Sequence, residues 1–340
     1  CVLVRRTSRK MRRTYDTARG LKKGQDTWDP PLDAGHRLEK PGRSISNSFL
    51  VGLLFYAILS LFAGGAWAVT VVAGGEHTCA ILNDGSVTCW GWNDKGQLGS
   101  GELSHLGRSS PAPVDPPLPR PVVKLALGYK HTCVVLDDGT ARCRGDNLHG
   151  QLGNGQIGDP NLVPQTPQGL CSTGSVADIA YGEEFTCAIC TDGMVMCWGR
   201  GGSGQLGHGA FSGHITPIST SPTISAIDIA LGAKAACALL QDGSVKCWGS
   251  NEYGQLGIGY NSAYPSSGLA HFSPQSSGAE ISTKATSISM SWYAGSAYDH
   301  ACRMLENGDV MCWGWSSNDM FDLGIGDDPT PIRSPTNSPS

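Results

Sequence analysis

The chain has 340 residues, 46 of them glycine, and only 16% are charged, a composition typical of many short strands joined by tight turns. Its formal net charge of −4 is unevenly divided: residues 1–46 hold 12 Lys or Arg against 5 Asp or Glu, so the rest of the chain carries −11. A body this acidic is not expected to bind nucleic acid by neutralising phosphates.

An apolar segment without charge, FLVGLLFYAILSLFAGGAWA, occupies residues 49–68. Basic residues precede it and a small-x-small site ends it, so residues 47–68 predict a secretory signal cleaved after Ala68. The run is also long enough to span a bilayer, which makes an uncleaved anchor the alternative. In both cases residues 1–46 form a basic, disordered n-region, and the chain from residue 69 reaches the cell exterior or a lumen.

The stretch HTCAILNDGSVTCWG at residues 77–91 predicts a β-hairpin. Asn-Asp-Gly at 83–85 suits a type I turn followed by a left-handed glycine, which makes a three-residue loop. In that register the two cysteines face each other at a non-hydrogen-bonded pair, where Cα atoms approach to about 4.5 Å and a disulfide can form. Four side chains share one apolar face: Cys79, Ile81, Val87 and Cys89.

This hairpin recurs four more times, each time with two cysteines ten residues apart around a turn. Since exported chains meet oxidising conditions, we expect five disulfides rather than zinc sites, for which the C-x2–4-C spacing is missing. Among the 13 cysteines, Cys171 and Cys190 are left as either a further pair or buried thiols. The four later pairs are Cys133 with Cys143, Cys187 with Cys197, Cys237 with Cys247, and Cys302 with Cys312.

Around each hairpin the chain follows G-x-x-H-T-C-A-x-L-x-D-G-x-V-x-C-W-G-x-N-x-x-G-Q-L-G, and a Pro-rich linker and a short apolar stretch such as VVKLALG (122–128) come next. This unit resembles the regulator of chromosome condensation repeat family, over residues 69–333, with residues 334–340 as a tail. The resemblance implies an all-β fold, a β-propeller of about five four-stranded units. The hairpins begin at His77, His131, Phe185, Ala235 and His300.

The two ends of the repeat region have different phases. VTVVAGG (69–75) matches the later strands of a unit, whereas PTPIR (329–333) matches PAPV (111–114), which we interpret as an opening strand. We therefore expect the C-terminal strand to complete a blade begun at the N-terminus, which would close a five-bladed ring without a free sheet edge. The alternative is an incomplete part of the seven-bladed ring that family members commonly form.

Departures from the repeat indicate structural roles. Arg144 stands where four units have the tryptophan of C-W-G, and Phe185 and Ala235 replace the consensus histidine. The fifth unit reads FDLGIG (321–326) in place of GQLG. A catalytic residue would not vary so freely between units.

Motifs that suggest chemistry have ordinary explanations here. Residues 202–207 satisfy G-x-G-x-x-G but follow a hairpin without a βαβ context, so we expect no nucleotide cofactor. The histidines at 77, 131 and 300 occupy one position of three units, which favours hydrogen bonding at strand starts over metal binding. We therefore predict no catalytic, cofactor or metal residues and a protein that is not an enzyme.

Aromatic residues at positions that the repeat does not dictate are the candidates for partner binding, because loops on rigid scaffolds carry function and Trp and Tyr are favoured interface anchors. Some of them can equally pack against neighbouring blades. The insertion at 260–282 is a further candidate. The aromatic residues are Trp92, Tyr129, Tyr253, Trp292, Tyr293 and Trp315.

These observations favour a secreted or cell-surface binding module whose rim loops engage a protein or a glycan. They favour no nucleic-acid partner, and a membrane contact only through residues 49–68 if these stay uncleaved. The alternative, from another class, is a guanine-nucleotide exchange factor-like regulator of a small GTPase, the role that the founder of the family performs. Export, the acidic body and the disulfides argue against a cytosolic GTPase partner, although fold alone does not determine function.

Overall fold

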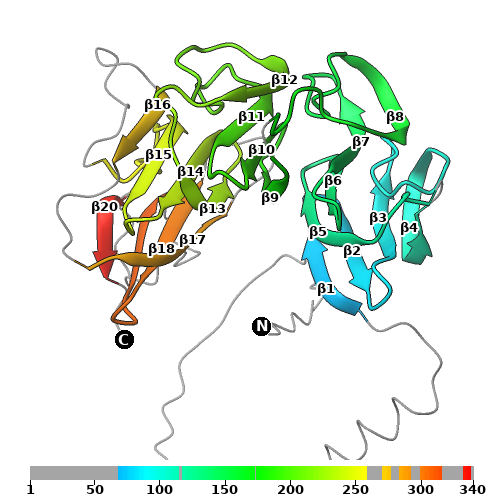
Figure 1. Ribbon diagram of the computed structural model, residues 1–340, viewed down its shortest axis with the longest axis horizontal. Coiled ribbons are helices and arrows are strands. Elements are labelled where there is room, and N and C mark those ends of the chain that lie inside the picture. The colour runs from blue at the N-terminus through cyan, green and yellow to red at the C-terminus, as the bar shows by residue number, and fades with distance from the viewer. Residues whose placement is uncertain are drawn as a thin grey trace, which may run out of the picture. The chain divides into compact units, whose positions relative to one another are not determined.

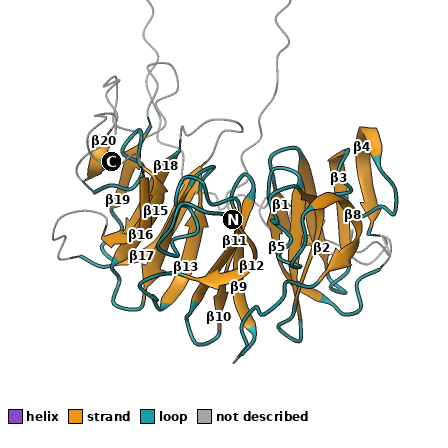
Figure 2. Ribbon diagram, turned by 90° about the horizontal axis from the view of Figure 1, so that it is seen from above, coloured by secondary structure: helices purple, strands orange, loops and turns teal. Residues whose placement is uncertain are grey.

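The computed structural model describes residues 68–114, 117–172, 174–258, 270–276, 283–291, 299–315 and 332–337 (Figure 1). Within these residues the chain forms 20 strands and no helix (Figure 2). The expected signal segment lies outside them except for Ala68, and the described part of the chain holds no helix with the length and hydropathy of a membrane span. All the strands belong to one compact unit, Gly64–Ser340.

The strands form five antiparallel sheets, here called blades 1 to 5, each made of four strands that are consecutive in the chain. Figure 1 shows the blades following one another from blue to red. Blade 1 consists of β1 (Ala68–Ala73), β2 (His77–Leu82), β3 (Val87–Asn93) and β4 (Ser104–Pro113). Blade 2 consists of β5 (Val122–Leu127), β6 (His131–Leu136), β7 (Ala141–Asn147) and β8 (Gly158–Gln165).

The other three blades repeat this order. Blade 3 consists of β9 (Val176–Tyr181), β10 (Phe185–Cys190), β11 (Val195–Gly199) and β12 (His214–Ser219). Blade 4 consists of β13 (Ala226–Leu231), β14 (Ala235–Leu240), β15 (Val245–Ser250) and β16 (Ala270–Ser276), so part of the 260–282 insertion supplies its last strand. Blade 5 consists of β17 (Ala285–Ser291), β18 (His300–Leu305), β19 (Val310–Gly314) and β20 (Ile332–Asn337).

The expected exchange of strands between the two chain ends is wrong. The Pro-rich strand that follows each hairpin is the fourth strand of the same blade, because β4 pairs with β3 and β20 pairs with β19. The N-terminal strand β1 is the first strand of blade 1 and pairs with β2. Each blade is therefore one continuous stretch of chain, and β20 extends to Asn337, beyond the expected end of the repeats at residue 333.

The hairpin register is confirmed in all five blades. In blade 1 the two cysteines lie opposite each other and Ile81 lies opposite Val87, and Gly85 has a φ of +77° at the end of the turn. All five expected cysteine pairs are disulfide-bonded, with Cα atoms 4.1 Å apart. They join Cys79 to Cys89, Cys133 to Cys143, Cys187 to Cys197, Cys237 to Cys247, and Cys302 to Cys312.

A sixth disulfide joins Cys171 to Cys190, the two cysteines whose state the repeat left open. Their Cα atoms lie 5.4 Å apart, and 19 positions of sequence separate them. Cys190 ends β10, so this bond ties the segment that precedes blade 3 to the hairpin of that blade. The first of the two alternatives, a further pair, is therefore the correct one.

Successive blades pack face to face in one repeating way. The side of each hairpin that carries the disulfide and its two apolar neighbours, here called the disulfide face, packs against the next blade. The next blade presents its tryptophan face, the side that carries an apolar residue of its first strand and the tryptophan of C-W-G. In blade 1 the disulfide face is Cys79, Ile81, Val87 and Cys89, and the tryptophan face is Val71, Thr78 and Trp90.

A hydrogen bond between blades explains the GQLG turn. The indole Nε1–H of Trp198 donates to the backbone carbonyl of Gln151 in the preceding blade, at 2.9 Å. The glycine of that turn, Gly153, has a φ of +69°, and a Cβ added there would lie 2.8 Å from the indole nitrogen. Trp248 and Trp313 repeat the bond at 2.9 Å with Gln205 and Gln255.

Arg144 occupies the tryptophan position of blade 2 and is buried. Its guanidinium fills the space beside Gly99, and its Nη1 has no hydrogen-bond partner among the described residues. Burial lowers the pKa of Arg144 to about 10, so the group remains a cation at neutral pH. A buried cation without a counter-charge is destabilising.

We expect Arg144→Trp to raise the free energy of unfolding by about 1–3 kcal/mol, since it removes the buried charge and allows an indole bond to the Gln97 carbonyl. Urea unfolding under non-reducing conditions measures the change. The reciprocal variant Trp198→Arg serves as control and should lose stability. Equal or lower stability of Arg144→Trp would show that the cation is compensated in the native protein.

Candidate binding rim

The aromatic candidates that the structure describes lie at one end of the blades, opposite the hairpin turns. Trp92 belongs to the end of β3, and Tyr129 lies between β5 and β6. Tyr253 follows β15 and Trp315 follows β19. These four residues define what we call the aromatic rim. Trp292 and Tyr293 lie outside the described residues.

Trp92 borders an open cavity on blade 1. The indole is 39% exposed, and the cavity of about 420 Å³ is lined by Glu76, Trp92 and Arg108 together with small residues of β3 and β4. Among these, Gly107 has a φ of +65°, and a Cβ there would lie 2.6 Å from the Gly91 carbonyl oxygen. This close approach of β4 to β3 shapes the cavity floor, which therefore depends on glycine.

Glu76 joins the two aromatic residues of blades 1 and 2. Its backbone carbonyl accepts the Trp92 N–H at 2.9 Å, and its carboxylate Oε1 accepts the Tyr129 hydroxyl at 2.9 Å. This hydrogen bond, together with burial, raises the pKa of Tyr129. The Oε2 atom of Glu76 is buried without a hydrogen-bond partner in the described chain and lies 3.7 Å from the Lys130 ammonium.

Lys130 holds the rim of blade 2 to that of blade 1. Its Nζ lies 2.8 Å from Oδ2 of Asp94 and 5.5 Å from the centre of the Tyr129 ring. Burial alone would raise the pKa of Asp94, but hydrogen bonds from Lys130, Trp92 and Gln97 outweigh it and hold the pKa below its ordinary value. The network fixes the side chains around the cavity before any ligand arrives.

The other aromatic pair lies at the junction of blades 4 and 5. The rings of Tyr253 and Trp315 meet edge to face, with centroids 4.7 Å apart. At the equivalent positions of blades 1 and 2, Lys95 and Asp146 form an ion pair of 3.8 Å. Tyr253 and Trp315 thus take the place of an ion pair between blades, and of the aromatic rim Trp92 is the residue that borders a cavity.

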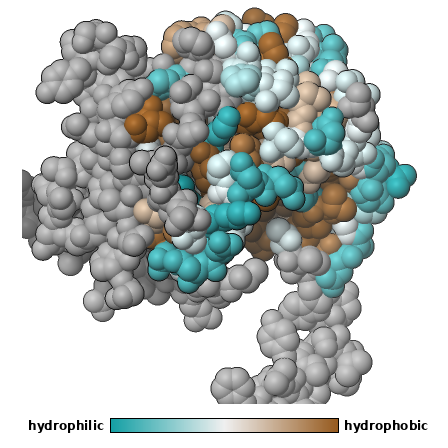
Figure 3. Space-filling model, turned by 60° about the vertical axis from the view of Figure 1, so that its left-hand side comes forward, coloured by the Kyte–Doolittle hydropathy of each residue, from teal (hydrophilic) through white to brown (hydrophobic). Residues whose placement is uncertain are grey.

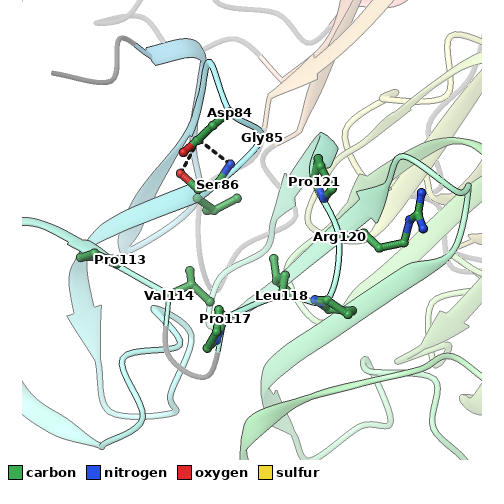
Figure 4. Close-up of a pocket in the computed structure, with 11 residues that line it drawn as sticks. Asp84, Gly85, Ser86, Pro113, Val114, Pro117, Leu118, Arg120 and Pro121 are labelled. Carbon is green, nitrogen blue, oxygen red and sulfur yellow. Dashed lines mark hydrogen bonds between the residues drawn. The ribbon is translucent and has the colours of Figure 1, made fainter. Parts of the chain in front are cut away.

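A second cavity, of about 350 Å³, lies at the hairpin-turn end of blade 1 (Figure 4). The turn at 84–86 forms one side, and the Pro-rich segment from Pro117 to Pro121 forms the other. Arg120 lines it, but its guanidinium pairs with Asp137 at 2.5 Å. The polar groups at this cavity are occupied by local bonds, such as that of Asp84 with Ser86, so it is the weaker candidate site.

Hydrophobic and hydrophilic residues interleave on the face drawn in Figure 3, where brown patches alternate with teal ones. A surface of this kind does not indicate a large apolar interface on that face. It favours recognition by individual aromatic and charged side chains, such as those of the rim.

The consensus histidines are hydrogen-bonded at strand starts, as expected for His77 and His131. Nε2 of His77 lies 2.6 Å from the Thr132 hydroxyl of the next blade, and Nε2 of His131 lies 3.0 Å from the Thr186 hydroxyl. Each hydroxyl donates its own proton to a backbone carbonyl of a GQLG turn, so each histidine donates from Nε2 and is neutral. Burial lowers the pKa of His77 to about 3 and that of His131 to about 4.

The departures from histidine follow the same contact. Phe185 of blade 3 is matched by Ala236 in blade 4, and Ala235 of blade 4 by Ala301 in blade 5, at the register position that threonine occupies in blades 2 and 3. A histidine therefore occurs where the next blade has threonine, and an apolar residue where it has alanine. This pairing explains the substitutions as packing rather than chemistry.

Sequence analysis missed the charged residues of the rim. Glu76 and Lys130 precede the consensus histidine, and Glu184 occupies the same position in blade 3, where it pairs with Arg200 and lies 3.4 Å from His149. An alignment of the five units shows this position to vary in charge, which was an available signal. What no repeat pattern predicts is that these residues bridge different blades.

The structure defines a repeat β-propeller, and the comparisons with known proteins identify its family. Residues 57–340 match the RCC1-like domain, so the chain belongs to the RCC1-like domain family. Proteins of this kind act as protein-binding modules or as exchange-factor-like regulators.

Similar curated proteins include the ultraviolet-B receptor UVR8 of Arabidopsis thaliana, 33% identical over 148 residues that cover 44% of this chain and 33% of UVR8. The human probable E3 ubiquitin-protein ligase HERC4 is 36% identical over 149 residues, 44% of this chain and 14% of HERC4. The Danio rerio protein RCC2 homolog is 34% identical over 132 residues, 39% of this chain and 26% of that protein. The chain thus spans about a third or less of these relatives.

Solved structures show the same fold at low identity. Human WBSCR16 aligns with a TM-score of 0.67 and 22% identity, over 82% of this chain and 68% of that one. Yeast RCC1 (Prp20), solved with bound Kap60, aligns with a TM-score of 0.65 and 20% identity, over 81% and 62% of the two chains. These likenesses support the RCC-type propeller predicted from the repeats.

The buried neutral histidines make stability fall with acid. Because the folded pKa of His131 lies below its unfolded value of about 6.5, its contribution is complete above that pH and is lost as the pH falls toward 4. We expect His131→Phe, which copies Phe185, to lose about 2 kcal/mol less than wild type between pH 7 and pH 5. Urea unfolding of both proteins at each pH measures the difference.

The comparison is made between variants because Asp299 acts in the opposite sense. Burial raises the pKa of Asp299 to about 6, so its contribution grows as the pH falls below that value in both proteins. Parallel stability curves for wild type and His131→Phe would contradict the assignment of a neutral, buried histidine.

Proposed function

We propose that this protein is a secreted or surface-tethered propeller that binds another protein through the aromatic rim, with a basic side chain of the partner seated beside Trp92. The observation that carries the proposal is the cavity in which an exposed indole stands next to the Glu76 carboxylate. Tryptophan is a common anchor of protein interfaces, and a cation beside its ring and a carboxylate is favourable.

Charge supports a basic partner. The chain after residue 46 carries a net charge of −11, and such a body attracts positively charged surfaces and raises their association rate. The rim is held by hydrogen bonds and ion pairs between blades, so little conformational entropy is lost on binding.

Two features support export. Residues 49–68 have the composition of a signal or an anchor, and six disulfides suit an oxidising compartment. Yeast RCC1 (Prp20) was solved bound to Kap60, and the protein from Saccharomyces cerevisiae was studied for binding to Gsp1p and histones, so protein recognition is established on this scaffold for that relative. An exchange-factor-like action on a small GTPase is the second candidate, and the experiment below distinguishes it.

The test expresses the full chain, with a C-terminal tag, in a secreting eukaryotic host. We expect the tagged propeller in the medium or on the cell surface, where an antibody reaches it without permeabilisation. Panels of extracellular proteins and of glycans are then screened with wild type. For the partner found, Trp92→Ala should weaken binding at least about tenfold, the loss expected for an interface anchor.

Ile157→Ala is the matched control, because Ile157 is also exposed but lies outside the rim, and it should bind as wild type does. A glycan hit with no protein hit would contradict a protein partner. Retention of the chain inside the cell, together with stimulated nucleotide exchange on a small GTPase, would favour the second candidate and overturn the proposal.

A further inference from the structure

The four internal junctions bury the same positions each time. On the disulfide face, the position of Ile81 is at most 6% exposed in blades 1 to 4, and the position of Val87 is at most 5% exposed. On the tryptophan face, the residues that correspond to Val71 in blades 2 to 4 are at most 9% exposed: Leu125, Ile179 and Ile229. A junction therefore needs both faces covered.

Blade 5 has an uncovered disulfide face. Met304 corresponds to Ile81 and is 45% exposed, and Val310 corresponds to Val87 and is 40% exposed. The disulfide beside them is less covered than the others, since Cys302 is half-buried whereas the first cysteine of the other four blades is buried. Side chains of the junction type thus lie open to solvent at the last blade.

Blade 1 has an uncovered tryptophan face. Val71 is 59% exposed, whereas its equivalents in blades 2 to 4 are buried. Trp90 is half-buried, although Trp198, Trp248 and Trp313 are completely buried. Thr78 is likewise half-buried, whereas Thr132 and Thr186 are buried.

The two open faces are matched in residue type as well as in burial. At the internal junctions, a histidine meets threonine, and phenylalanine or alanine meets alanine. Blade 5 carries His300 at this position, and blade 1 carries Thr78. Blade 5 therefore presents the type of face that, within this chain, packs against a threonine-bearing tryptophan face, and blade 1 presents such a face.

We propose that a second copy of this chain covers these faces, so that the disulfide face of blade 5 in one copy packs on the tryptophan face of blade 1 in the other. Both faces are open in the structure, so the contact is assigned between copies rather than within one. Val71, Trp90, Met304 and Val310 carry no charge, and their burial drives association by the hydrophobic effect. Such an interface is heterologous, joining two different surfaces of the same protein.

The test measures the mass of the full chain by light scattering after size exclusion, without reductant and over a wide range of concentration. We expect wild type to have twice the mass of the chain or more. Val71→Glu and Met304→Glu each disable one face, and each should yield monomers. Ile157→Glu, an exposed site outside both faces, should keep the wild-type mass.

Mixing the two variants makes the test specific. Val71→Glu retains the disulfide face of blade 5 and Met304→Glu retains the tryptophan face of blade 1, so the mixture should form a dimer and nothing larger. Val310→Glu replaces Met304→Glu if that variant fails to fold, as judged by its number of disulfides. Trp92→Ala should not change the mass, which separates this result from the fate of the proposed rim.

A monomeric wild type at every concentration would overturn the proposal, because the faces would then stay open or close within one chain. A wild-type oligomer that both face variants leave intact would also overturn it. So would a mixture of the variants that stays monomeric, since the contact would then join identical faces.

Discussion

The structure depends on the register of one hairpin. An Asx-Gly turn places two cysteines opposite each other at a position where the strands approach closely, and the resulting disulfide lies on the apolar face of the blade. That face forms one half of each junction between blades. A slip of one residue would move the cysteines and their apolar neighbours to the other face, so the turn, the disulfide and the junction are specified together.

The junctions leave the rim free to vary. Trp198, Trp248 and Trp313 bond to the carbonyls of the preceding turns, and these bonds, with the packing around them, hold the ends of the strands in place. The residues just before each hairpin then differ in charge from blade to blade without loss of the fold, as Glu76 and Lys130 illustrate. A rigid scaffold with variable rim residues suits recognition. Function on this fold therefore resides in side chains that the repeat does not dictate.

Much of the fold could be predicted because the repeat carries it five times. The turn, the cysteine pairs and the four-stranded unit follow from local chemistry that any one hairpin displays. The assignment of PTPIR to an opening strand failed because a Pro-rich strand looks alike at either edge of a blade, and only pairing with β19 decides. The match of Phe185 with Ala236, and the contact of Glu76 with Tyr129, join residues about 50 positions apart, and no local pattern indicates them.

The central claim is that the cysteines pair within hairpins and not between blades. Proteolysis of the exported chain without reduction, followed by mass spectrometry of the linked peptides, tests it most directly. The account predicts five linked pairs ten residues apart and a sixth between Cys171 and Cys190. Free thiols at these positions, or linked peptides from different hairpins, would contradict the register from which the blades, their junctions and the rim are derived.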